Sequence, residues 1–222
     1  MPLILLLSLA VIQRNIHWKN DFTLWSDVLQ KSSHKMRPHQ KMGLILYIEK
    51  GNLDEAMKEM MIAIQLKPDA PELHNNMGIF YQRKGLLGRA IEEYNQAIRI
   101  KPDYQQAFLN LGTVYLEKGE FQSALDAFTR AIQLKPDDIY AYNNIGFVYS
   151  DMGEYEKAIE MHKRAVSIKH DEPTGFYGLA LAYEGMGLKR EAAGYWREYL
   201  RLAPPGDSWR EEALRHIRKL NP

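Results

Sequence analysis

Apolar residues recur along the chain with the spacing of an amphipathic helix. In the segment 90–98, AIEEYNQAI, apolar side chains occupy the first, second, fifth, eighth and ninth positions, with charged or amide side chains between them. Offsets of three and four residues place these apolar positions on one face of a helix. Segments with this spacing follow one another over most of the chain. The pattern therefore predicts an all-α protein built of short amphipathic helices.

The helical pattern repeats with a period of 34 residues, and five columns of like residues keep this step. Two of the columns are glycine, two are alanine, and the last is proline, with His170 where one proline is missing. The columns are Gly78, Gly112, Gly146; Gly51, Gly85, Gly119, Gly153, Gly187; Ala56, Ala90, Ala124, Ala158, Ala192; Ala63, Ala97, Ala131, Ala165; and Pro68, Pro102, Pro136, Pro204.

Each column has a physical reason. Small residues such as Gly78 and Ala90 let two antiparallel helices approach closely, because a larger side chain would overfill the contact. The column of Gly85 suits a tight turn between the two helices, where a positive φ favours glycine. The column of Pro102 lacks a backbone N–H and is expected to stop the second helix of each unit. The sequence thus predicts a series of helix-turn-helix units.

These residues resemble the tetratricopeptide repeat (TPR), a helix-turn-helix unit of 34 residues. The resemblance implies an α-α superhelix, a TPR solenoid of about five repeats with capping helices. The repeats are expected at 36–70, 71–104, 105–138, 139–172 and 173–206, between an N-terminal part, 1–35, and a C-terminal cap, 207–222.

The two ends of the array depart from the regular pattern. Gly43 and Tyr47 are four residues apart instead of three, which predicts one inserted residue in the first helix of the 36–70 unit. The segment 22–33 is expected to be the second helix of a degenerate unit, with Trp25 in the large-residue column. After residue 206, an apolar stripe among Arg and Glu predicts an amphipathic capping helix. The stripe consists of Trp209, Ala213, Leu214, Ile217 and Leu220.

Candidate binding residues come from the first helix of each unit. The column Asn76, Asn110, Asn144 resembles the asparagine ladder of the TPR superhelix in O-linked N-acetylglucosamine transferase. An amide offers a donor and an acceptor to a peptide backbone; the alternative is that these amides bond a neighbouring helix. Aromatic side chains on the same helices are candidate anchors for a partner, although packing between helices explains Phe147 equally well. The groove residues expected beside the column are Tyr140, Asn143, Phe147 and Tyr177.

Composition and spacing indicate no catalytic chemistry. The chain has no cysteine, which excludes disulfides and thiol chemistry, and its net charge of +1 gives no general attraction for nucleic acid. No phosphate-binding loop and no paired histidine ligands are found, so no cofactor, no metal and no enzyme activity are expected. His39, His74 and His162 occupy columns that are aromatic in other units and are interpreted as packing residues.

The N-terminal stretch raises the question of a membrane. Leu3 to Ile12 is apolar apart from Ser8, but as a helix it spans only about 15 Å of a bilayer core of roughly 30 Å. The residues that follow, up to Gly43, are similar to the junction in transmembrane-and-TPR proteins that have a glycosyltransferase-like membrane region. A membrane-associated location is therefore favoured. The alternative is a soluble cytoplasmic protein in which this apolar segment is a hydrophobic helix that packs on the first repeat.

The resemblance implies a non-catalytic adaptor that binds an extended peptide or a helix of a partner protein in its concave groove. The alternative is the TPR tail or subunit of a membrane glycosyltransferase that presents protein substrates. A self-associating scaffold is a third hypothesis. Membrane contact through Leu3 to Ile12 is compatible with each of them.

Overall fold

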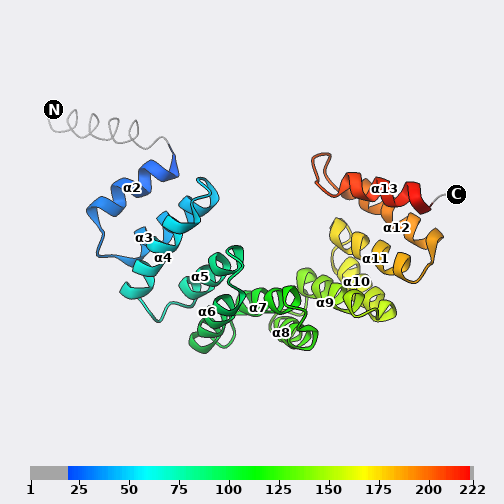
Figure 1. Ribbon diagram of the computed structural model, residues 1–222, viewed down its shortest axis with the longest axis horizontal. Coiled ribbons are helices and arrows are strands. Elements are labelled where there is room, and N and C mark those ends of the chain that lie inside the picture. Colours follow the sequence, from blue (N-terminus) through cyan, green and yellow to red (C-terminus); the bar gives the residue numbers. More distant parts are fainter. Residues whose placement is uncertain (1–19, 221–222) are drawn as a thin grey trace, which may run out of the picture. The chain divides into compact units, whose positions relative to one another are not determined.

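The structure is a computed structural model that describes residues 20–220, and helices are the only regular elements in that range (Figure 1). The chain divides after Pro102 into two compact units. The first unit contains α2 (Asp21–Lys31), α3 (Met36–Ile48), α4 (Leu53–Leu66), α5 (Pro71–Arg83) and α6 (Leu87–Ile100). The second contains α7 (Gln105–Glu117), α8 (Phe121–Leu134), α9 (Ile139–Asp151), α10 (Tyr155–Ile168), α11 (Pro173–Gly185), α12 (Lys189–Leu202) and α13 (Arg210–Leu220).

The small-residue columns lie where paired helices touch. A Cβ added to Gly78 in α5 would lie 2.5 Å from the ring of Tyr94 in α6. A Cβ added to Gly112 in α7 would lie 2.6 Å from the ring of Phe128 in α8. Real Cβ contacts are not this short, so each pair needs glycine opposite its aromatic ring. The predicted helix-turn-helix pairing is confirmed.

The turns inside the pairs use glycine as predicted. Gly51, Gly85, Gly119, Gly153 and Gly187 all have a positive φ, between 61° and 76°. In the regular pairs the turn closes with a backbone hydrogen bond from the residue after the glycine to the carbonyl five residues earlier, such as Leu86 N to Tyr81 O at 2.9 Å. This is the hydrogen bond of a glycine-terminated helix, and it reverses the chain between the two helices.

The sequence analysis placed the extra residue of the 36–70 segment inside the first helix. In the structure it lies in the turn that follows this helix. The helix α3 has 13 residues, as α5 has. The turn that follows it closes from Asn52 N to Leu46 O at 2.9 Å, six residues back instead of five. A longer turn absorbs the residue at no cost to helix packing, so Gly43 still faces α4.

Proline is not what ends the second helices. The helices α4, α6, α8 and α12 each end two residues before a proline of the repeated column. The helix α10 ends at the equivalent residue, Ile168, although His170 stands in the proline column. Each of these ends is followed by an extended or irregular residue, and Lys67, Lys101, Lys135 and Lys169 take that place in four helices. A cationic side chain at this position also suits the negative end of the helix dipole.

In the second unit the first helices form a continuous layer. The helix α9 contacts both α7 and α11, whereas α8, α10 and α12 make no comparable contact with one another in the part of the unit that the structure describes. The second helices instead pack against the first helix of the next pair, as α8 does on α9 and α10 does on α11. One side of this unit therefore consists of the surfaces of α7, α9 and α11.

The capping helix α13 packs on α12, but its predicted stripe is only partly correct. Ala213 and Leu220 are buried in the same core cluster as Trp196. Leu214 and Trp209 are exposed, and Trp209 precedes the first residue of α13. His216 Nδ1 lies 2.7 Å from Glu184 Oε2, which ties the cap to α11. Trp209 is thus not part of the buried stripe, because the chain still turns at that point and the helical spacing does not apply.

Candidate functional site

A pocket of about 340 Å³ opens in the second unit, between the first-helix layer and the turn that leads to the cap. Its walls come from α9, α11, α12 and the segment before α13. The lining residues are Phe147, Pro173, Thr174, Tyr177, Tyr199, Asp207 and Trp209. Most of these side chains are aromatic, and one is a carboxylate.

Tyr177 is the central ring of this pocket, which we call the aromatic pocket. Its ring centroid lies 5.5 Å from that of Tyr199, 6.0 Å from Trp209 and 6.3 Å from Phe147. The interplanar angles are 66°, 62° and 65°. Rings inclined in this way form walls that face in different directions, whereas a flat stack would leave no space between them.

Asp207 holds two walls of the aromatic pocket in place. Its Oδ1 accepts a hydrogen bond from the Tyr199 hydroxyl at 2.7 Å and another from the backbone N–H of Trp209 at 2.8 Å. Burial raises the pKa of Tyr199, and the hydrogen bond to Asp207 raises it further, so the phenol stays a donor. Nearby, Arg210 donates to the carbonyl oxygens of Leu200 and Ala203 at 2.7 and 2.6 Å and caps the end of α12.

The aromatic residues expected in the groove have different environments. Tyr140, at the start of α9, is 58% exposed. Phe147 and Tyr177 are half-buried and both line the aromatic pocket. Phe147 also packs on the ring of His162, with centroids 4.9 Å apart. Phe147 therefore completes helix packing and also presents part of its ring to the pocket, while its role as an anchor for a partner stays a prediction.

The amide column is half-buried throughout. Asn110 accepts a hydrogen bond at Oδ1 from Gln106 Nε2 at 3.2 Å, within α7. Asn144 lies in α9, and Asn76 lies in α5 of the first unit. The next position of the column is Gly178, where a Cβ would lie 2.2 Å from the His162 ring. The column therefore ends at Gly178 because the preceding second helix fills that space.

Asn143 is buried, although the sequence analysis placed it in the groove. It is 2% exposed, and its Oδ1 lies 3.0 Å from Nδ1 of His162. Asn143 Nδ2 and His162 Nε2 are buried, and neither has a hydrogen-bond partner among the described residues. Burial lowers the pKa of His162 to about 3, so this ring is neutral near pH 7. We therefore leave Asn143 out of the candidate binding face.

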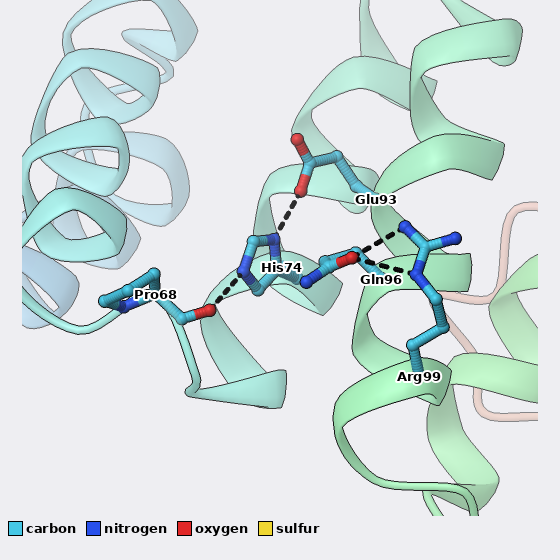
Figure 2. A network of polar contacts seen from close by, with 5 residues as sticks. All are labelled: Pro68, His74, Glu93, Gln96 and Arg99. Carbon is cyan, nitrogen blue, oxygen red and sulfur yellow. Dashed lines mark hydrogen bonds and ion pairs between the residues drawn. The ribbon is translucent and has the colours of Figure 1, made fainter.

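The packing histidines of the first unit also have a polar role that the spacing did not reveal. His74 Nδ1 lies 2.7 Å from Glu93 Oε2, and His74 Nε2 lies 2.9 Å from the carbonyl oxygen of Pro68 (Figure 2). Both partners are acceptors, so both bonds form fully only when the ring carries two hydrogens. The hydrogen bond to Glu93 raises the pKa of His74 accordingly.

His39 makes the same pair of contacts one repeat earlier. Its Nδ1 lies 2.6 Å from Glu59 Oε2, and its Nε2 lies 2.7 Å from the Ser33 carbonyl oxygen. Each histidine thus joins a second helix to the loop that precedes its own helix. In the sequence, the signal is a glutamate 20 residues after His39 and 19 after His74. The difference of one residue is the longer turn after α3.

A second pocket, of about 310 Å³, lies between α2 and α3 in the first unit. Trp25 lines it together with Lys41 and Ile48. Trp25 is half-buried, so only part of its side chain packs between helices as the large-residue column predicts. Ile48 is 74% exposed, the highest value among the large apolar side chains of residues 20–102.

Two further features of residues 20–220 bear on the sequence-based expectations. No group of three or more His, Asp or Glu side chains there is arranged to hold a metal ion. No helix in the same range combines the length and the apolar composition that a bilayer crossing requires. Leu3 to Ile12, on which the membrane prediction rests, lie outside the described residues.

Family models match the central part of the chain. The model described as TPR repeat matches residues 46–85, 83–119 and 112–153, and the model described as Tetratricopeptide repeat matches 139–172. These matches begin after the segment that is similar to the transmembrane-and-TPR junction, so they lend that similarity no support. Comparison with curated proteins gives no significant match.

Solved structures give the same result. A crystal structure of MamA is 33% identical, with a TM-score of 0.62, over 70% of this chain and 91% of that chain. TTC0263, a thermophilic TPR protein in Thermus thermophilus, is 24% identical, with a TM-score of 0.70, over 82% of this chain and 99% of that chain. YrrB, described as a TPR protein with an unusual peptide-binding site, is 19% identical, with a TM-score of 0.62, over 88% of this chain and 97% of that chain.

The likeness to TTC0263 and YrrB concerns the fold alone, and 444 solved chains match in total, so resemblance of fold does not select a function. The matched repeats, the paired helices and the MamA likeness agree with one another. The fold class is the all-α TPR solenoid that the sequence predicted. This chain belongs to the tetratricopeptide repeat family.

Proposed function

We propose that this protein is a non-catalytic adaptor whose second unit binds an extended segment of a partner protein. The binding face is the layer formed by α7, α9 and α11, and Asn76 in the first unit is assigned no part in it. Repeat proteins present extended faces of this kind because each repeat contacts only its neighbours. The observation that carries the proposal is the aromatic pocket, to which α9 contributes Phe147 and α11 contributes Tyr177. Tyr140 adds an exposed aromatic side chain at the start of α9.

The chemistry of this face suits a protein segment. Exposed or half-buried aromatic side chains are the residues that most often dominate binding energy at protein interfaces. The Asn144 side chain forms no hydrogen bond within residues 20–220, so its amide is available to a peptide backbone. Asn110 already bonds Gln106 near the protein surface, where exchange for a peptide partner costs little.

A selection from a library of short displayed peptides tests the proposal. Peptides that bind the immobilised protein are measured against the parent, Tyr140→Ala and the double variant Asn110→Ala/Asn144→Ala. An aromatic anchor contributes about 2 kcal/mol, so Tyr140→Ala is expected to weaken binding about 30-fold. The double variant Asn110→Ala/Asn144→Ala is expected to lower the affinity for peptides of unrelated sequence to a similar degree, because a contact with the peptide backbone does not depend on the peptide's side chains.

The control variant is Glu160→Ala, at an exposed position of the second helix α10. It is expected to leave peptide affinity unchanged. If Glu160→Ala weakened the selected peptides while the Tyr140 and asparagine variants bound them normally, the binding face would lie on the second helices and the proposal would be wrong.

The membrane-linked and self-associating alternatives rest on the sequence alone and have separate tests. Fractionation of the full chain beside a version that begins at Trp18 tests the role of Leu3 to Ile12. Retention of only the full chain in the membrane fraction, at high salt, supports the membrane anchor and with it the glycosyltransferase-linked alternative. A molecular mass that rises with protein concentration supports self-association.

A further inference from the structure

The aromatic pocket contains a carboxylate that forms no ion pair within residues 20–220. Asp207 is the one charged side chain among its lining residues. Both of its hydrogen bonds, from Tyr199 and Trp209, come from neutral donors and reach Oδ1. Within residues 20–220, Oδ2 has no partner, and Asp207 forms no ion pair. The carboxylate therefore has one oxygen available to a ligand.

The cations near the aromatic pocket are engaged by other groups. Arg210 is close enough to affect the pKa of Tyr199, but its guanidinium donates to two carbonyl oxygens at the end of α12. Lys169 lies 3.4 Å from Glu172, which also accepts a hydrogen bond from Thr174 at 3.1 Å. Burial raises the pKa of Tyr177, and the nearby carboxylate of Glu212 adds to this increase. Arg210 and Lys169 are thus both engaged by groups other than Asp207.

Aromatic rings together with a carboxylate favour a cation over other ligands. A cation within about 6 Å of a ring centroid is attracted by the negative face of the ring, by about 0.5–2 kcal/mol per contact. An apolar ligand would remove water from Asp207 without replacing its interactions, which is unfavourable. An anion would be repelled. At about 340 Å³ the pocket is large enough for a long side chain but small for a cofactor.

We propose that the aromatic pocket binds the basic end of a lysine or arginine side chain carried by the partner segment. The ammonium or guanidinium group would lie against Trp209 and Tyr177 and donate to the free oxygen of Asp207. The identity of the carrier rests on the proposed function, whereas the preference for a cation rests on the pocket alone. The partner segment is therefore one with a basic residue at its end nearest the cap.

Small cations test the pocket without any peptide. Tetramethylammonium, N-acetyl-lysine amide and N-acetyl-arginine amide are titrated into the full chain and followed by the NMR signals of the Trp209 indole N–H and the Thr174 amide. N-acetyl-norleucine amide, which has a similar alkyl chain and no charge, is the matched probe. The cations are expected to cause saturable shifts at both positions, and norleucine amide none.

Two variants connect the signal to the proposed residues. Asp207→Asn keeps an acceptor for Tyr199 and is expected to lower the affinity for N-acetyl-lysine amide about fivefold. This is the upper end of the effect of an ion pair near the surface. Trp209→Leu removes an exposed ring and is expected to reduce the Thr174 shift further. Asp126→Asn, an identical charge change at an exposed position of α8, is the control and is expected to have no effect.

The outcomes separate this inference from the proposed function. Equal shifts with norleucine amide, or no shift with any cation, would overturn the cation site even if displayed peptides bind the first-helix face. Saturable cation shifts that depend on Asp207 and Trp209 support the site even if no displayed peptide binds, and in that case only the carrier is wrong.

Discussion

The Tyr199 hydroxyl donates a hydrogen bond of 2.7 Å to Asp207 Oδ1, and this contact joins the last turn of α12 to the segment that leads into α13. Asp207 also accepts from the backbone N–H of Trp209, so one carboxylate orients two aromatic walls of the pocket. The rigidity of the cap and the shape of the pocket therefore depend on the same residue.

Replacing this carboxylate should destabilise the cap. Asp207→Ala leaves the Tyr199 hydroxyl without its acceptor and is expected to lower the free energy of unfolding by about 1–3 kcal/mol. Asp207→Asn retains an acceptor oxygen and should lose less. Urea denaturation followed by circular dichroism compares the two variants, and equal stability of Asp207→Ala and the parent would contradict a structural role for this contact.

The glycine column should not tolerate a methyl group where it meets an aromatic ring. Gly78→Ala places a Cβ 2.5 Å from the Tyr94 ring and is expected to cost about 1–3 kcal/mol through overpacking. Gly88, in the neighbouring helix α6, has nothing within 4 Å of its Cβ position. Gly88→Ala is therefore expected to stabilise by about 0.5–1 kcal/mol, because alanine is the better helix former. Thermal denaturation of both variants should show shifts of opposite sign.

The first unit should lose stability as the pH rises. Because Glu93 raises the pKa of His74, the folded protein holds this proton more tightly than the unfolded chain, whose histidine titrates at about pH 6.5. The resulting stabilisation is complete below about pH 6.5 and is lost as the pH rises through the higher pKa of the folded state. Phenylalanine stands at the equivalent positions of two other repeats, Phe108 and Phe176. His74→Phe should therefore reduce the dependence of stability on pH.

Urea midpoints of the parent and His74→Phe at several values between about pH 6 and pH 9 measure the slope. Glu93→Gln serves as the control, because it removes the charged acceptor and keeps the histidine. It should reduce the pH dependence as His74→Phe does. Identical slopes in the parent and in both variants would show that the contact drawn in Figure 2 contributes nothing to the pH dependence.

The second unit should lose stability in acid through His162. Burial lowers its pKa to about 3 in the folded state, whereas the unfolded histidine accepts a proton at about pH 6.5. Stability from the neutral ring is therefore complete above about pH 6.5 and falls as the pH drops towards 3, by up to about 1.4 kcal/mol per pH unit. The double variant Asn143→Leu/His162→Phe copies Leu109 and Phe128 of the preceding pair and should remove this component.

Asn143→Leu alone keeps the histidine and is the matched control for the loss of stability in acid. The double variant and the control are compared by urea denaturation at several pH values across this range. A double variant that follows the control at every pH would mean that the pKa of His162 is the same in the folded and unfolded states, and the pKa shift would be wrong.

The repeat spacing predicted the helices and their turns because these depend on residues close in sequence. Gly85 needs a positive φ where its own chain reverses, and Gly78 needs space opposite a ring a few residues beyond that turn. The extra residue after α3 was visible in the spacing, but its place was not. Only the hydrogen bond from Asn52 to Leu46 locates it in the turn.

The candidate site was harder to predict, because neighbours on one helix face different directions. Asn143 and Asn144 are adjacent in sequence, and successive helical residues are rotated by about 100°. Asn143 is therefore buried against His162, while the Asn144 side chain is half-buried and has no such partner in the described part of the chain. The spacing also placed Trp209 in the buried stripe of the cap, although the helix starts only at the next residue.

By itself, the sequence determined the TPR fold, the glycine turns and the set of first helices that carry Phe147 and Tyr177. Tertiary structure alone decided that these two residues meet Tyr199, Asp207 and Trp209 in one pocket. The physical reason is one of range. A period of 34 residues specifies which face of each helix is buried, because the rotation per residue is constant along a helix. The pocket depends on distances between side chains from four separate segments, and these distances arise only when the helices pack.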